Sequence, residues 1–471
     1  MDAKRHRTVH FAAGRLAQVC DGELLQGDPK TGAAGVSTDT RSLAPGQAFV
    51  ALVGPNHDAH AYLSDAVAAG ASVLMVQRLP EPLDPPEHVA VVRVADTERA
   101  LLSLAAWHRG QLDATVVAVT GSCGKSTVKD MLGAILGRTA ATTTAPASFN
   151  NRIGVAHTLL AAGADDRYVV LEMGTNHPGE IAELAGAARP EIGVITHIGK
   201  AHLEGLGGPE GVREAKAELI PHLPRGGALI LNADSPECLS LRVRYAGRVL
   251  TFATRGTADV RPRDLERTDD GWRFDALARR FHLPCPARYD VDNAAAALCA
   301  ARALEISPDV AAAALADFQP RGLRYQRMEL DGVLFVLDCY NSNPTALRAA
   351  LKSFVMERNP GRKVVVCGDM LELGDAAPLL HRRAGEELAR SDIDALFAVG
   401  KLGRCLLNGW NEVRPAGGAS HFECAREAWQ PLWESIEPGD AVLLKGSRGT
   451  QLETIAERIA EHLGLPGREV A

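Results

Sequence analysis

The sequence predicts an α/β protein of three domains. Short apolar runs alternate with segments of helical periodicity, which is the pattern of strands joined by crossover helices. A chain of 471 residues is too long for one hydrophobic core. Residues 115–120 (TVVAVT) are almost wholly apolar, as expected of a strand that is buried on both faces of a parallel sheet.

The predicted domains span residues 1–108, 109–319 and 320–471. In the first, a small α/β unit, strands are expected at 49–53, 73–76 and 89–94, and helices at 61–69 and 97–108. In the second, strands at 115–120, 168–172, 192–198 and 228–231 alternate with helices at 125–136, 180–188 and 212–223, and an alanine-rich helix follows at 293–304. In the third, which is entered through the segment 320–324, strands are expected at 333–337, 363–367, 396–399 and 441–444, and helices at 345–354, 379–389 and 451–462. Strands separated by helices imply largely parallel sheets.

Composition and charge restrict the partners. The chain is 46% hydrophobic and 23% charged, and its formal charge of −7 gives no general attraction to nucleic acid or to anionic lipid. Nine cysteines without CxxC pairs indicate reduced thiols. No apolar core follows the basic residues Lys4, Arg5 and Arg7, and no stretch approaches the roughly 20 apolar residues of a membrane helix. We therefore expect a cytoplasmic protein that binds no nucleic acid and does not insert in membranes, and a monomer.

A glycine-rich loop follows the strand at 115–120 and precedes a helix. Its residues are Gly121, Ser122, Cys123, Gly124, Lys125, Ser126 and Thr127. Glycines let backbone N–H groups approach phosphate oxygens, and the helix N-terminus favours negative charge. Lys125 would contact the β- and γ-phosphates and Ser126 a Mg²⁺ ion, so ATP is the expected ligand. The loop is a short variant, because Val119 stands where the common spacing has glycine. The alternative interpretation is an ordinary glycine turn at the start of a helix.

Cys123 lies within this loop, and two interpretations of it are open. Either only its backbone amide matters, or the helix N-terminus lowers the pKa of the thiol and makes it reactive. In the second case, alkylation of Cys123 would block activity and ATP would protect against it.

Motifs on both sides of the loop occur in a fixed order over nearly the whole chain. They are Ser37-Thr38-Asp39-Thr40-Arg41, Ser148-Phe149-Asn150-Asn151, Glu172-Met173-Gly174, His202-Leu203-Glu204, Arg213-Glu214-Ala215-Lys216, Asp338-Cys339-Tyr340-Asn341, Gly368-Asp369-Met370-Leu371-Glu372-Leu373-Gly374 and Lys445-Gly446-Ser447-Arg448. With the loop, this ordered set resembles the Mur ligase family. The resemblance implies a central sheet like that of P-loop ATPases and a Rossmann-like third domain. It also implies an ATP-dependent ligase that joins D-alanyl-D-alanine to a UDP-N-acetylmuramoyl-tripeptide through an acyl phosphate.

The resemblance assigns the metal and catalytic residues. It implies that Ser126, Glu172, His202 and Lys216 hold Mg²⁺, with two ions expected, and that Lys125 and Asn151 act with them at the γ-phosphate. Lys216 matches a lysine that the family carboxylates, and a lysine held neutral by burial can form such a carbamate. From the residues alone, His202 reads as structural and Lys216 as a solvated helix residue paired with Glu214 or Glu218.

The remaining motifs are assigned to the ligands in the same way. The resemblance implies ATP contacts from Asn293, Arg324, Asp338 and Asn341, and substrate contacts from Ser37, Thr38, Asp39, Arg41, Asn150, Lys445 and Arg448. In isolation, these motifs read as polar turns between strands and helices. The sequence departs from the family pattern at His197 and Ser342, and Tyr289-Asp290 replaces the usual His-Asn pair. That last departure leaves the adenine-side contacts open.

The implied chemistry needs positioning and cations rather than a nucleophilic side chain, because phosphoryl transfer depends mainly on geometry and charge stabilisation. Two alternatives stay open: a ligase like folylpolyglutamate synthetase, and an inactive nucleotide-binding paralogue. The motif at 368–374 and the predicted N-terminal UDP-binding domain disfavour the first, and the presence of Lys125, Glu172, His202 and Lys216 disfavours the second. Whether the tripeptide carries lysine or diaminopimelate does not follow from the sequence.

Overall fold

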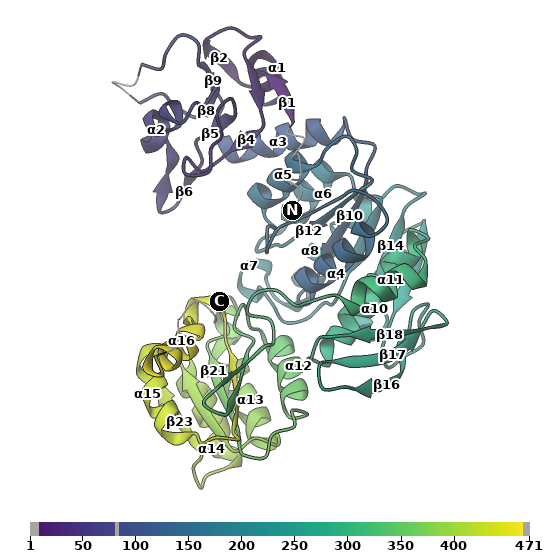
Figure 1. Ribbon diagram of the computed structural model, residues 1–471, viewed down its shortest axis with the longest axis vertical. Coiled ribbons are helices and arrows are strands. Elements are labelled where there is room, and N and C mark those ends of the chain that lie inside the picture. Colours follow the sequence, from purple (N-terminus) through teal and green to yellow (C-terminus); the bar gives the residue numbers. More distant parts are fainter. Residues whose placement is uncertain (1–8, 81–83, 465–471) are drawn as a thin grey trace.

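The structure is a computed structural model that describes residues 9–80 and 84–464. The basic residues Lys4, Arg5 and Arg7 lie outside the described residues. Three α/β regions follow one another in chain order, from the purple N-terminal region to the yellow C-terminal one (Figure 1). The α/β class with parallel sheets is therefore confirmed.

The N-terminal region is built on a five-stranded sheet in the order β2-β9-β8-β5-β4. Its strands are β2 (Glu23–Gln26), β4 (Val36–Ser37), β5 (Ala48–Val50), β8 (Val73–Val76) and β9 (Ala90–Arg93), and all neighbours are parallel except β2 and β9. Two further strand pairs, β1 (His10–Ala12) with β3 (Gly32–Ala34) and β6 (Val53–Gly54) with β7 (His57–Asp58), accompany α1 (Ala13–Val19), η1 (Ala59–Tyr62), α2 (Leu63–Ala68) and α3 (Thr97–Arg109). The prediction of one strand at 49–53 is wrong, because β5 ends at Val50 and Val53 begins a separate hairpin around Pro55.

The central region holds a six-stranded sheet in the order β11-β12-β10-β13-β14-β15, parallel throughout. Its strands are β10 (Thr115–Thr120), β11 (Thr142–Thr144), β12 (Tyr168–Glu172), β13 (Ile192–Ile195), β14 (Ala228–Asn232) and β15 (Arg248–Phe252). Its helices are α4 (Lys125–Gly137), α5 (Arg152–Ala161), α6 (Glu180–Ala188), α7 (Leu203–Leu206), α8 (Pro209–Ala217), η2 (Ile220–His222), α9 (Pro236–Leu239), η3 (Ser240–Arg244), α10 (Tyr289–Ala303) and α11 (Pro308–Ala316). The predicted helix at 212–223 is wrong in its second half, since the chain tightens into η2 around Pro221, which has no backbone N–H.

An antiparallel sheet that the sequence did not predict packs on the central region. It consists of β16 (Arg263–Arg267), β17 (Trp272–Ala276) and β18 (Arg279–Leu283). The inward residues Trp272, Phe274 and Phe281 are buried, whereas Arg273 and Arg280 beside them are charged and exposed. The short alternating pattern of these strands is therefore less visible than the continuous apolar runs of the parallel sheet.

The C-terminal region is a second six-stranded sheet, in the order β19-β20-β24-β21-β22-β23. Its strands are β19 (Gln326–Leu330), β20 (Val333–Leu337), β21 (Lys363–Gly368), β22 (Ala395–Val399), β23 (Ala419–Phe422) and β24 (Ala441–Lys445), and only β19 is antiparallel to its neighbour. Its helices are α12 (Pro344–Phe354), η4 (Gly374–Ala376), α13 (Ala377–Arg390), α14 (Gly403–Val413), α15 (Ala425–Ser435), η5 (Arg448–Thr450) and α16 (Glu453–His462).

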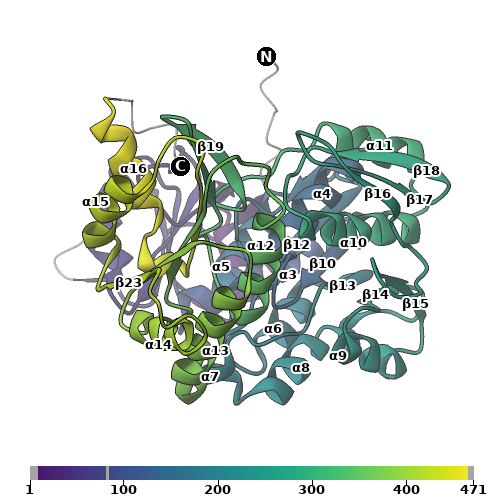
Figure 2. The same ribbon diagram turned by 90° about the horizontal axis from the view of Figure 1, so that it is seen from below.

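The three regions share contacts that position the site. Leu101 and Leu104 of α3 belong to the same hydrophobic cluster as Val155 and Leu159 of α5, so the first region packs on the second. On the other side, α7 contacts η4, and it lies next to the α13 end of the C-terminal region in both views (Figures 1 and 2). Among the described helices, none is both long and apolar enough to cross a bilayer.

Candidate active site

The carboxyl ends of the parallel strands of two sheets face one cleft of about 780 Å³. The central region contributes residues of the glycine-rich loop, Asn150, Asn151, Glu172 and His202. The C-terminal region contributes Arg324, Asp338, Asn341 and Lys445. In open α/β sheets, ligands bind at this edge, where loops after several strands converge.

The loop after β10 requires glycine at two positions. Gly121 has φ +147°, and a Cβ there would lie 2.0 Å from Oγ1 of Thr196. Gly124 has φ +80°, and a Cβ there would lie 2.4 Å from Oδ1 of Asn293. Helix α4 begins at Lys125, whose Nζ donates to the carbonyl oxygen of Gly121 at 2.9 Å. Ser122 to Thr127 all line the cleft, so the predicted loop has the geometry of an anion cradle.

Cys123 is expected to react slowly with alkylating reagents. Burial raises the pKa of its thiol to about 11, so little thiolate forms near neutral pH. Iodoacetamide at pH 7.5 should modify the exposed Cys424 well before Cys123, and ATP should slow the modification of Cys123 further. Peptide mass spectrometry over time checks the order. Rapid labelling of Cys123 would contradict the interpretation that only its backbone matters.

Glu172 ends β12 and is almost fully buried. Its Oε1 accepts a hydrogen bond from Nδ2 of Asn150 at 2.8 Å, while its Oε2 has no partner among the described residues. A buried carboxylate oxygen without a partner is costly, and a cation would satisfy it. Asn150, which is predicted to contact substrate, lines the cleft and also orients this carboxylate.

Asn151 has a second structural task. Its Oδ1 accepts from the backbone N–H of Gly154 at 2.9 Å and so caps α5. Because the carbonyl side of the amide serves as the cap, the NH₂ group is left for the cleft, which Asn151 lines.

Lys216 lies on α8 and is fully buried, and its Nζ has no hydrogen-bonding partner among the described residues. Burial first, and then the charge of Lys125, lowers the pKa of this amine well below its ordinary value. A neutral amine is the form that reacts with CO₂, so the residue fits the predicted carbamate. The interpretation of Lys216 as a solvated lysine is wrong.

His202 adopts the left-handed conformation just before α7, with φ +54°. It lines the cleft, and its Nδ1 lies 2.5 Å from Oε2 of Glu372. Within residues 9–80 and 84–464, no three His, Cys, Asp or Glu side chains form a group that could hold a metal ion alone. An ion at Glu172 and His202 would therefore need further oxygen ligands, which phosphate, Ser126 or a carbamate can supply.

Arg324 connects the C-terminal region to the loop after β10. Its guanidinium donates to Oγ of Ser126 at 2.9 Å and to Oγ of Ser148 at 3.0 Å, and it stacks over Tyr340 with 4.3 Å to the ring centroid. Nearby, Nζ of Lys445 donates to the backbone oxygens of Asp338 at 2.9 Å and Asn341 at 2.5 Å. Two cations from the third region thus lie on the same cleft as Lys125.

Comparison with known proteins agrees with this geometry. Residues 119–301 match the Mur ligase middle domain, and residues 323–448 match the Mur ligase glutamate ligase domain. The UDP-N-acetylmuramoyl-tripeptide–D-alanyl-D-alanine ligase of Bacillus subtilis is 36% identical over 91% of this chain and 93% of its own length. The chain belongs to the Mur ligase family.

Solved structures extend the match. A crystal structure of MurF from Acinetobacter baumannii superposes with a TM-score of 0.87 and 32% identity, over 97% of this chain and all of that one. The MurF ligase of Thermotoga maritima, solved in complex with ADP, gives a TM-score of 0.79 and 27% identity, covering 91% of this chain and 97% of that one. Since the matches include the N-terminal region, the folylpolyglutamate synthetase alternative is not favoured.

Where this Mur ligase departs from the family pattern, the partly buried His197 and Tyr289 line the cleft, whereas the buried Asp290 does not. Asp290 accepts from Nδ2 of Asn293 at 3.1 Å, and burial raises the pKa of its carboxyl to about 7. Tyr289 packs edge-on against Tyr325. His197 accepts the N–H of Ser122 through its backbone oxygen, so its side chain is not needed for that contact.

Some predicted substrate residues of this Mur ligase lie elsewhere. Ser37, Thr38, Asp39 and Arg41 do not line the cleft; they sit in the N-terminal region, where Oγ1 of Thr38 is 3.1 Å from Nε2 of His157 on α5. Arg448 also lies off the cleft, in an ion pair of 2.7 Å with Glu453. Gly121 and Lys216, predicted as ATP and metal contacts, are not among the residues that line the cleft.

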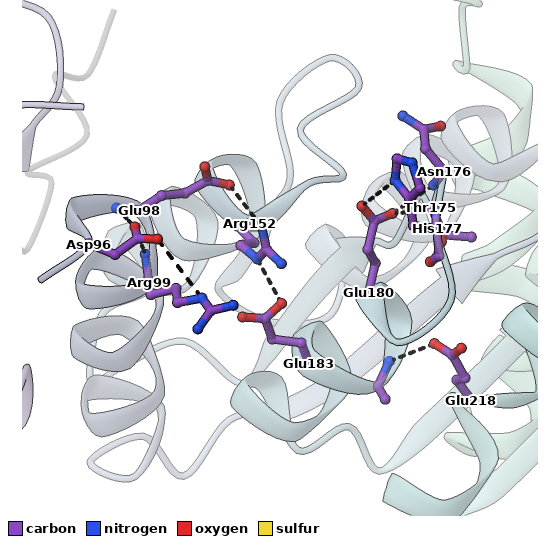
Figure 3. Close-up of polar contacts among 11 residues, drawn as sticks. Asp96, Glu98, Arg99, Arg152, Thr175, Asn176, His177, Glu180, Glu183 and Glu218 are labelled. Atoms are coloured by element: carbon purple, nitrogen blue, oxygen red, sulfur yellow. Dashed lines mark hydrogen bonds and ion pairs between the residues drawn. The ribbon is translucent and has the colours of Figure 1, made fainter. Parts of the chain in front are cut away.

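The cleft residues of this Mur ligase that were not predicted include Glu98, Arg152 and Glu180. Figure 3 shows Arg152 between Glu183, at 2.7 Å, and Glu98 of α3, at 3.7 Å, so it bridges the first two regions. Glu180 accepts the backbone N–H groups of Asn176 and His177 at 2.6 and 3.1 Å. The motif at 148–155 contained Arg152, but nothing in the sequence around Glu98 signals a contact with another domain.

Proposed function

We propose that this Mur ligase uses ATP to join D-alanyl-D-alanine to a UDP-N-acetylmuramoyl-tripeptide in the synthesis of peptidoglycan precursors. The name of the B. subtilis relative, which matches over most of both chains, supports this substrate pair. The observation that carries the chemistry is the convergence of Lys125, Arg324 and Lys445 on one cleft. Beside them lies a buried carboxylate oxygen of Glu172 that has no hydrogen-bonding partner among the described residues. Such a cleft suits two anionic reactants that must meet.

The reaction has two steps. An oxygen of the tripeptide's terminal carboxylate attacks the γ-phosphorus of ATP, the bond to the β–γ bridging oxygen breaks, and ADP leaves. The amine of the dipeptide then attacks the carbonyl carbon of the acyl phosphate, loses a proton and expels inorganic phosphate, which leaves an amide. In both steps the chain supplies positive charge and orientation.

The residues of the chain have separate tasks in these steps. Lys125 and the backbone N–H groups of the loop hold the β- and γ-phosphates, Arg324 fixes Ser126 and Ser148, and the NH₂ of Asn151 is free to donate to a phosphoryl oxygen. Two Mg²⁺ ions, when bound, would neutralise phosphate charge, and Ser126, Glu172, His202 and a carbamate on Lys216 are the groups that would hold them. Asn293, Asp338 and Asn341 would contact the nucleotide.

The proposed division of labour follows the three regions. Residues 1–108 would bind the UDP group through Ser37, Thr38, Asp39 and Arg41, residues 109–319 would bind ATP, and residues 320–471 would present the dipeptide near Lys445 and Arg448. We propose a cytoplasmic monomer. Its nine free cysteines and nucleotide substrates suit a reducing compartment.

Measuring ADP release while each substrate is omitted in turn tests this proposal. We expect ADP to form at a sustained rate only when ATP, the UDP-muramyl tripeptide and D-alanyl-D-alanine are all present. Running the assay with lysine-containing and diaminopimelate-containing tripeptides identifies which tripeptide the enzyme uses. Equal ATP hydrolysis without the dipeptide would indicate a simple NTPase, and no turnover with either tripeptide would indicate an inactive nucleotide-binding paralogue.

A further inference from the structure

The C-terminal region touches His202 directly. Glu372 lies in the loop between β21 and η4, and its Oε2 is 2.5 Å from Nδ1 of His202. The contact is an ion pair, and the same nitrogen has no hydrogen-bonding partner among the described residues. The sequence analysis predicted His202 as a metal ligand, but it predicted no residue of the third domain in contact with His202.

The backbone specifies this contact as well as the side chains do. The N–H of Glu204 donates to the carbonyl oxygen of Glu372 at 3.3 Å, and a Cβ at Gly374 would lie 3.3 Å from Cα of Glu204. His202 and Glu372 are both left-handed, with φ of +54° and +62°. Residues with side chains keep this conformation where the surroundings hold them in it. Two such residues facing each other across a domain boundary indicate a built contact.

The position of the cleft decides which edge of the imidazole is free. His202 lines the cleft, whereas Glu372 is not among the described residues that do so. Glu372 contacts the ring at Nδ1, so Nε2 is the nitrogen that this contact leaves free. A carboxylate that accepts the Nδ1 proton fixes the tautomer whose Nε2 carries a lone pair. In metal sites, this kind of contact sets the orientation and basicity of a ligating histidine.

We propose that Glu372 is a positioning residue that orients His202 for metal binding when the C-terminal region is docked on the central region. Docking of the C-terminal region and completion of the metal site are then one event, because the residue that orients His202 belongs to the C-terminal region. The inference rests on the proposed function, which requires a divalent cation at Glu172 and His202. It adds a residue of the C-terminal region to those that determine the binding of that cation.

Mn²⁺ affinity tests the proposal without turnover. We would titrate the full-length protein with Mn²⁺ in the presence of ADP and follow free Mn²⁺ by electron paramagnetic resonance. Glu372→Ala should weaken Mn²⁺ binding about tenfold or more, whereas Glu372→Gln, which keeps an acceptor oxygen, should retain most of the affinity. Glu204→Ala is the matched control. It removes an exposed carboxylate from the same interface, and no contact of that carboxylate with His202 is found among the described residues.

A double-mutant cycle makes the test specific. In a His202→Ala background, Glu372→Ala should cause no further loss of Mn²⁺ affinity, because the only route of its effect is gone. Unchanged affinity in Glu372→Ala, an equal loss in Glu204→Ala, or additive losses in the cycle would overturn the proposal. Tighter binding in Glu372→Ala would also overturn it, since Glu372 would then compete with the metal. Ligation by the wild-type protein, measured separately, distinguishes these failures from failure of the proposed function.

Discussion

Replacing Lys125 with alanine should lower kcat for ligation by roughly 10³-fold, the loss typical of a main transition-state contact. The reason lies in how the cations of the cleft are already engaged. Lys445 is buried and donates to two backbone oxygens beside Asp338, and Arg324 donates to Ser126 and Ser148. Of these three cations, Lys125, whose Nζ donates to the carbonyl of Gly121, is the most available to a phosphate.

Steady-state ADP release checks this prediction, with kcat and the KM for ATP measured separately. Lys200→Ala is the matched control, because Lys200 is an exposed lysine on the loop after β13 that does not line the cleft. We expect that control to keep wild-type kinetics. Turnover of Lys125→Ala within tenfold of the wild type would mean that other groups hold the transferring phosphoryl group.

The parallel sheets were predictable because their strands are buried on both faces. Strands β8, β10, β12 and β20 and helix α6 match the predicted ranges residue for residue. A continuous run of Val, Ile and Leu has no other stable place in a protein of this composition. The antiparallel sheet β16–β18 was missed, because Arg263–Arg267 is mostly charged and only one face of that sheet is covered.

Part of the set of residues that line the candidate site could be named from the sequence, but their arrangement could not. The loop after β10 could be placed because strand, glycines and helix are adjacent in the sequence. Asn150 and Asn151 could be named, yet the roles found here, orienting Glu172 and capping α5, depend on which neighbour each amide meets in three dimensions. The burial of Lys216 was equally hidden, since α8 carries charged residues on both sides of it.

Contacts between domains could not be predicted from the sequence. Local periodicity describes how a segment packs within its own sheet, but it carries no information on which loops of distant domains meet. The contacts of Arg324 with Ser126 and of His202 with Glu372 each join two regions. These are the contacts through which closure of the C-terminal region can affect the phosphate-binding loop and the metal site.

Replacing Lys216 with alanine should abolish ligation, and short carboxylates such as acetate should partly restore it. Nζ of Lys216 is buried without a hydrogen-bonding partner among the described residues, and burial lowers the pKa of the amine well below its ordinary value, which favours the neutral form. The neutral nitrogen attacks CO₂ and loses a proton to solvent, which gives a carbamate anion where a cation would otherwise stand. Lys125 is close enough to lower the pKa of the amine, so the same charge would stabilise a carbamate in its place.

Two variants separate the carbamate from a structural role for Lys216. Lys216→Ala leaves a space that a free carboxylate can enter, whereas Lys216→Met fills that space with an apolar chain of similar length. We expect acetate to raise the kcat of the alanine variant and not that of the methionine variant, with both proteins unfolding at similar temperatures. In the wild type, ¹³C-labelled bicarbonate should give a carbamate resonance that is absent from both variants. Full activity in Lys216→Met would rule out the carbamate, because no group at that position could then supply an oxygen to the cleft.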